Sequence, residues 1–165
     1  MAEKQIKRIH WIPAFALQTL IIPLEITRNI RWYENILNTT SPFYIIALLF
    51  ALYLHFQCWK AVYSVHARTT PFKAVVFLFI PFLDIYWGFI SFSCLAKGLY
   101  QTSRDAEIAG VKDLSIWGIF YWISILVTVV MGSIRWINLI PLFASYTIWI
   151  LFYKRMTQYA NRIQS

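Results

Sequence analysis

Apolar and polar positions divide the chain into five apolar segments separated by shorter polar ones. The apolar segments are residues 11–27, 42–59, 74–96, 114–132 and 136–153. Runs such as Val75 to Ile80 are apolar at every position, whereas the strands of a membrane barrel alternate. Apolar runs of about 20 residues are typical of helices that cross a bilayer. The pattern therefore predicts an all-α integral membrane bundle, a single membrane domain over residues 1–165.

Residues 42–59 are the clearest candidate for a crossing helix, because they carry no formal charge. Polar residues 38–41 precede Pro42, and a proline after such residues is a signal for the start of a helix. We therefore predict a helix that begins near Pro42. It would be barely long enough to cross the hydrocarbon core.

Two other stretches do not fit a single straight crossing. Residues 114–153 would form a helix of about 60 Å, roughly twice the hydrocarbon thickness, so we predict that the chain folds back near residues 132–138. Residues 74–96 carry Pro81, Asp84 and Gly88 near their centre. This segment is predicted to be broken, and either re-entrant or a kinked crossing helix.

Composition strengthens the membrane interpretation. Hydrophobic residues make up 59% of the chain and charged residues 13%, against about 25% charged in soluble domains. So few charges cannot cover the surface of a small soluble domain, and so apolar a chain is not intrinsically disordered. The formal net charge is +8, and the basic residues flank the apolar runs, as they do beside anionic lipid headgroups. We expect a bilayer with anionic headgroups as the partner, and no nucleic acid.

Counts of Lys and Arg separate three possible topologies. If residues 74–96 are re-entrant and the other four segments cross, the two sides carry twelve and three basic residues. If residues 11–27 lie flat instead, the counts are eleven and four. Five crossings give seven and eight, which is no asymmetry. Either layout with four crossings places both termini in the cytoplasm, with the chain in the inner (plasma) membrane.

Asp84 is the only acid deep in a strongly apolar segment, and such a group is a candidate functional site. One interpretation is a proton or cation site. The other is a structural acid that accepts hydrogen bonds from backbone amides freed by Pro81. His55 and Tyr53 lie in the preceding apolar segment, although His55 is about 9 Å nearer the loop than Asp84. The candidate site comprises Asp84, Pro81, Gly88, Ser91, Tyr53 and His55.

The sequence offers no pattern for catalysis or for a cofactor. It has no zinc pair, phosphate-binding loop, nucleophile elbow or paired carboxylates. Cys58 and Cys94 are isolated in apolar runs and are interpreted as packing residues. We therefore expect no catalytic residue, no metal and no cofactor.

Residues 70–87 carry a motif that resembles an uncharacterised family of small bacterial multi-pass membrane proteins. The matching residues are Thr70, Pro71, Ala74, Val75, Phe79, Ile80, Pro81, Phe82, Tyr86 and Trp87. The resemblance covers under a quarter of the chain and implies no activity. The family pattern has Asn where this chain has Asp84, which implies a hydrogen-bonding role, since Asn does not titrate.

These observations predict a small inner-membrane protein without catalysis of its own. It would act as an oligomer, or as a subunit or partner of a larger membrane assembly. The alternative is a homo-oligomeric pore or carrier for ions or small solutes, lined by the helix break at Pro81–Asp84.

Overall fold

The computed structural model describes residues 8–30, 35–62, 69–131 and 139–164. These residues form six α-helices and one short 3-10 helix, with no strand in the described ranges, so the all-α prediction is confirmed. The helices are α1 (Ile12–Ile30), α2 (Asn35–Val62), α3 (Pro71–Val76), α4 (Leu83–Asp105), α5 (Ser115–Met131) and α6 (Leu139–Gln164), with the 3-10 helix η1 (Phe77–Phe79) after α3.

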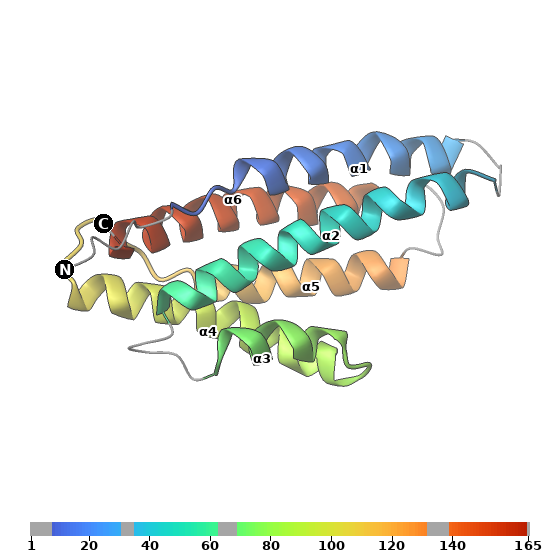
Figure 1. Cartoon of the computed structure of the whole chain (residues 1–165). Coiled ribbons are helices and arrows are strands. Elements are labelled where there is room, and N and C mark those ends of the chain that lie inside the picture. Colours follow the sequence, from blue (N-terminus) through green and yellow to red (C-terminus); the bar gives the residue numbers. More distant parts are fainter. Residues whose placement is uncertain (1–7, 31–34, 63–68, 132–138, 165) are drawn as a thin grey trace.

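Helices α1, α2, α5 and α6 lie side by side along one axis (Figure 1). The pairs α1–α2 and α5–α6 are in contact, and the two helices of each pair run in opposite directions. The start of α1 and the end of α6 meet at one end of the bundle. There the Ile9 amide donates to Asn161 Oδ1 at 2.7 Å, and Asn161 Nδ2 donates to the Ile9 carbonyl at 3.0 Å.

The segment around Pro81 reverses the chain. Ile80 is extended, as residues before a proline tend to be, and Phe82 has a φ of 66°. Helical structure therefore stops after Phe79 and resumes at Leu83. Trp87 Nε1 of α4 donates to the Ala74 carbonyl of α3 at 3.2 Å. Accordingly, α3 with η1 and the first half of α4 form an antiparallel helical hairpin, not one kinked helix (Figure 1).

The helix boundaries differ from the predictions in two places. The α2 helix begins at Asn35, so the predicted start near Pro42 is wrong. A proline inside a helix removes one backbone donor and crowds the carbonyl four residues before it, and packing of α2 along α1 offsets this local cost. The predicted segment 74–96 ends at Ala96, whereas α4 continues to Asp105. The predicted fold-back at 132–138 lies outside the described residues.

Only one helix in the described ranges is long and apolar enough to cross a membrane by those two criteria, and this stretch is Ile45–Val62 of α2. Residues Ser115–Met131, which form α5, are a shorter apolar helix. The prediction of four crossings is therefore not confirmed by helix length and composition.

The core lies where α2, α4 and α6 meet, toward the end of the bundle that holds the start of α1 and the end of α6. Its fully buried side chains include Cys58, Trp59 and Val62 of α2, Leu95 and Leu99 of α4, and Phe152 and Met156 of α6. Two Ala residues, Ala14 of α1 and Ala47 of α2, are also buried. Gln18 Nε2 of α1 donates to the Ala47 carbonyl at 3.3 Å, which couples α1 to α2.

Candidate functional site: a buried polar cluster around His55

His55 lies in the core and has polar partners on three helices. On its own helix, Trp59 Nε1 donates to His55 Nε2 at 3.1 Å. Ser91 Oγ of α4 is 2.8 Å from the same nitrogen, and the Tyr153 hydroxyl of α6 is 2.7 Å from Nδ1. The exposed fractions of His55, Ser91 and Tyr153 are 1%, 0% and 2%. The imidazole therefore links α2, α4 and α6 away from the surface.

The donors and acceptors define one tautomer of His55. An indole N–H can only donate, so Nε2 must accept from Trp59 and cannot carry a proton. In a neutral imidazole the proton then resides on Nδ1, which donates to the Tyr153 oxygen. Ser91 Oγ is the second group at Nε2, and its single hydrogen is shared between this nitrogen and the Ala74 carbonyl oxygen. All of these partners are uncharged groups, as a neutral buried histidine requires.

The carbonyl of Ala74 extends the cluster to α3. It lies 3.1 Å from Ser91 Oγ and accepts from Trp87 Nε1 at 3.2 Å. The Ser91 hydroxyl is thus within reach of two acceptors, Ala74 O and His55 Nε2. This carbonyl is held because Thr70 caps α3, with its Oγ1 accepting from the Lys73 amide at 3.2 Å. The cluster therefore also fixes the hairpin against the bundle.

Aromatic rings enclose the cluster on the side of α5. Phe92 is 4.6 Å from the His55 ring, centroid to centroid, and 5.0 Å from the Tyr121 ring. Tyr121 in turn is 6.3 Å from Tyr153. These ring contacts exclude water, so the polar atoms of the cluster form their hydrogen bonds with one another.

Two glycines set the close approach of α4 and α5 next to the cluster. A Cβ on Gly88 would lie 2.0 Å from the Trp122 ring, and a Cβ on Gly118 would lie 2.7 Å from the Phe92 carbonyl oxygen. Gly88 and Phe92 are four residues apart on α4, as are Gly118 and Trp122 on α5. Trp122 Nε1 also donates to the Ile85 carbonyl at 2.9 Å. Each glycine therefore allows a close approach of the other helix: the Trp122 ring lies over Gly88, and the Phe92 backbone lies over Gly118.

The structure brings together only part of the predicted site. His55 and Ser91 are in contact, and Gly88 lies one turn of α4 away, against Trp122. Pro81 is exposed in the reversal. Half-buried Asp84 follows it, where Oδ1 accepts from the Ile85 amide at 2.8 Å.

Tyr53 lies apart from both groups. It is 55% exposed and lines a cavity of about 260 Å³ between α2 and the start of α1. The sequence-based grouping missed Trp59, Tyr153, Ala74 and Trp87. Helical spacing could have found Trp59, which is four residues after His55. Nothing local in the sequence indicates Tyr153, which is 98 positions away.

The chemistry available to this cluster is limited by its burial. A serine hydroxyl beside an imidazole nitrogen, with a third group on the other nitrogen, has the connectivity of a nucleophile–base pair. Here, however, the Ser91 hydroxyl is fully buried and a substrate cannot reach it. Within the described ranges, no three His, Cys, Asp or Glu side chains gather as they would around a metal ion. The arrangement is suited to holding α2, α3, α4 and α6 in one register.

Comparisons with protein-family models, with curated proteins and with solved structures found no match. The resemblance of residues 70–87 to a family of membrane proteins therefore stays a prediction.

Proposed function

We propose that this chain is a multi-pass inner-membrane protein without catalysis of its own, which acts as a structural subunit of a membrane assembly. The observation that supports it is the distribution of polarity across the bundle. Large apolar side chains are exposed on every long helix, while polar side chains such as His55, Ser91 and Thr157 are buried. The exposed set includes Ile12 and Leu20 on α1, Leu49 and Phe50 on α2, Ile116 and Phe120 on α5, and Ile140 and Leu151 on α6.

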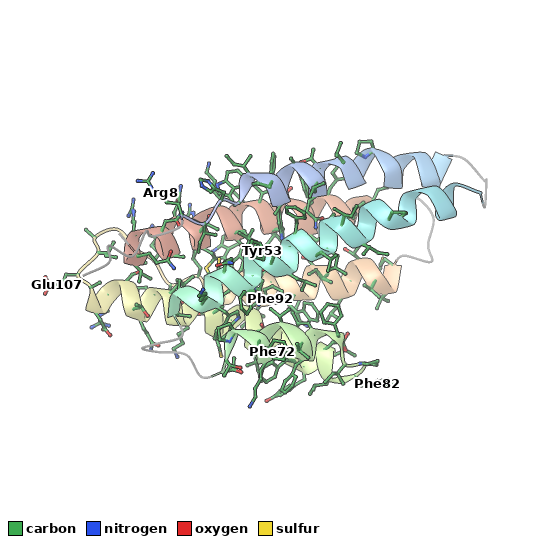
Figure 2. All side chains as sticks on the ribbon, in the orientation of Figure 1. Arg8, Tyr53, Phe72, Phe82, Phe92 and Glu107 are labelled. Atoms are coloured by element: carbon green, nitrogen blue, oxygen red, sulfur yellow. The ribbon has the colours of Figure 1, made fainter. Side chains whose placement is uncertain are left out.

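In a soluble protein so much exposed apolar surface would drive aggregation. In hydrocarbon the same side chains are solvated by lipid tails, and polar groups must find partners inside the protein. The position of charged residues also supports a membrane placement. Arg8 and Glu107 lie toward one end of the bundle, beyond its apolar middle (Figure 2). The bilayer is therefore the solvent that fits this surface.

In the proposed topology α1, α2, α5 and α6 cross, and the hairpin of α3 and α4 enters and leaves from one side. The six residues of α3 and three of η1 advance by about 15 Å, half of the hydrocarbon thickness. This layout places both termini, residues 60–73 and residues 97–113 on the side with twelve of the fifteen Lys and Arg, which is the cytoplasmic side.

The tip of the hairpin supports a role in an assembly. Ile80, Pro81 and Phe82 lie between η1 and α4, outside any helix, and Phe82 is 88% exposed (Figure 2). Irregular backbone is tolerated at membrane depth only where protein or a water-filled cavity covers it. No other element of the described chain covers this tip. A second copy of the chain or another membrane subunit would therefore cover it.

Photo-cross-linking in intact cells tests this proposal. A benzoyl-phenylalanine at position 82 should form protein adducts, whereas the same probe at Phe120, which is exposed on α5, should react mainly with lipid. Alkaline carbonate should leave the protein in the membrane pellet. Release by carbonate would contradict the membrane placement, and lipid adducts alone at position 82 would contradict the assembly.

A homo-oligomeric pore or carrier is the second candidate. The observation that favours it is Asp84, a half-buried carboxylate beside the exposed reversal, where several copies could line a path. Ion or proton flux through reconstituted liposomes that is lost in Asp84→Asn would favour the pore over the structural subunit.

A further inference from the structure

We propose that the cleft between the start of α5 and the last turns of α6 binds an anionic phospholipid through its phosphodiester group. Two cavities form the cleft, and Arg155 of α6 lines both of them. This inference rests on the membrane placement proposed above, and it assigns one lipid to a defined position in that membrane.

The polar part of the cleft is a cavity of about 300 Å³. Its lining includes three cations, Lys112, Arg155 and Arg162, and no acid. Arg155 makes no hydrogen bond or ion pair with any residue in the described part of the chain, so its five N–H donors are open to a ligand. A guanidinium binds two oxygens of one phosphate at once, which makes a phosphodiester the matching partner.

Two neutral side chains add donors to the same cavity. The Tyr159 hydroxyl accepts from the Lys112 amide at 3.2 Å and keeps its own hydrogen for a ligand, and Gln158 contributes its amide. Asp113 follows Lys112 in the sequence, but its Oδ1 accepts from the Ser115 amide at 2.8 Å at the start of α5. The nearest acid in the sequence is thus engaged in capping a helix and does not line the cavity.

The apolar part of the cleft is a groove of about 70 Å³ lined by Leu114, Trp117, Leu151 and Phe152. Trp117 and Leu151 are both nearly half exposed, so the groove opens on the outer surface of the bundle. It accommodates the first few carbons of an acyl chain, with the remainder in the bilayer.

The order of polarity along α6 matches the order of groups in a phospholipid. Leu151 lies toward the apolar middle of the bundle, Arg155 one turn farther on, and Arg162 near the end of the helix. Trp117 sits at the level where tryptophans collect in membrane proteins, between the apolar and polar zones. Basic pockets between helices on the cytoplasmic side are known binding sites for anionic headgroups.

The test is native mass spectrometry of the full chain in a neutral detergent. Phosphatidylglycerol and phosphatidylcholine with identical acyl chains are added in equal amounts. We expect the wild-type protein to retain phosphatidylglycerol preferentially. Arg155→Gln combined with Lys112→Gln should lower this preference by about fivefold for each charge removed. Lys60→Gln with Lys97→Gln removes the same charge from exposed positions near the same end and should leave the preference unchanged.

Soluble competitors separate a lipid from free phosphate. Inorganic phosphate and glycerophosphoglycerol, each at the lipid concentration, should not displace phosphatidylglycerol, because neither fills the groove at Trp117. Displacement by inorganic phosphate would overturn the lipid assignment. Equal losses in the two double variants, or no preference in the wild type, would overturn the site.

Two further measurements separate loss of the lipid site from poor folding and from failure of the membrane placement. Arg155→Lys retains the charge but not the paired donors, so an intermediate preference is expected even if the double variant folds poorly. A protein that stays in the membrane after alkaline carbonate but shows no lipid preference contradicts this inference alone. A protein released by carbonate contradicts the proposed function itself.

Discussion

His55 and Tyr153 are 98 positions apart in the chain, and their side chains share a 2.7 Å hydrogen bond inside the bundle. This contact joins α2 to α6, while Ser91 and the Ala74 carbonyl join the same imidazole to α4 and α3. A polar network without water access is stabilising only when its members have partners. The cluster therefore specifies one register among these helices, because sliding any of them by a turn would leave a buried donor unpaired.

The substitution Tyr153→Phe should destabilise the protein by about 1–3 kcal/mol, because it leaves the Nδ1 proton of His55 without an acceptor in a buried site. The measurement is thermal or denaturant unfolding of the detergent-solubilised protein. Tyr53→Phe is the matched control, since Tyr53 is exposed, and it should change stability by less than about 0.5 kcal/mol. Equal effects of the two substitutions would contradict the role assigned to the cluster.

Gly118→Ala should cost about 1–3 kcal/mol, because the new methyl group would meet the Phe92 backbone and force α4 and α5 apart. Gly98→Ala is the control within the same core. A Cβ there would lie 3.7 Å from Val62, an ordinary contact, and alanine is the better helix former. We therefore expect Gly98→Ala to be neutral or stabilising in the same unfolding assay. Tolerance of Gly118→Ala would mean that α4 and α5 are not held at this crossing.

Much of the secondary structure could be predicted from apolar runs, whereas the helix ends could not. The break at Pro81 follows from local chemistry, since a proline restricts the residue before it and removes a donor. The start of α2 does not, because packing of α2 against α1 overrides the signal at Pro42. The direction of α4 after the break also depends on a tertiary contact, the one between Trp87 and the Ala74 carbonyl.

The candidate site could also be predicted only in part. His55 and Ser91 could be selected as isolated polar residues in apolar runs, and the structure brings them together. Asp84 is also an isolated polar residue in an apolar run, but it lies at the chain reversal, where it accepts a hydrogen bond from the Ile85 backbone amide. The pairing of His55 with Tyr153 depends on how α6 returns along α2, and a single sequence without aligned relatives carries no signal of it.

Asp84→Asn should be well tolerated, because an amide oxygen can still accept from the Ile85 amide. Asp84→Leu should lower stability or assembly by about 1–3 kcal/mol, since it leaves a backbone donor near the reversal unsatisfied. Melting temperature and oligomer size in detergent measure both effects. If Asp84→Asn folds normally but eliminates an ion flux of the wild-type protein, the structural interpretation is wrong and the pore replaces it.

The re-entrant hairpin predicts that Thr69 lies on the cytoplasmic side of the membrane. A single cysteine, Thr69→Cys, in a background without Cys58 and Cys94 should resist an impermeant thiol reagent added outside intact cells and react once the inner membrane is opened. Thr69 immediately precedes the cap of α3, so its side of the membrane is the side from which the hairpin enters. Ser133→Cys is the control, because the proposed topology assigns residue 133 to the opposite side of the membrane, and it should react in intact cells. Labelling of Thr69→Cys from outside would contradict the re-entrant hairpin. It would favour the layout in which residues 74–96 cross and α1 lies flat, because that layout still places eleven of the fifteen basic residues in the cytoplasm.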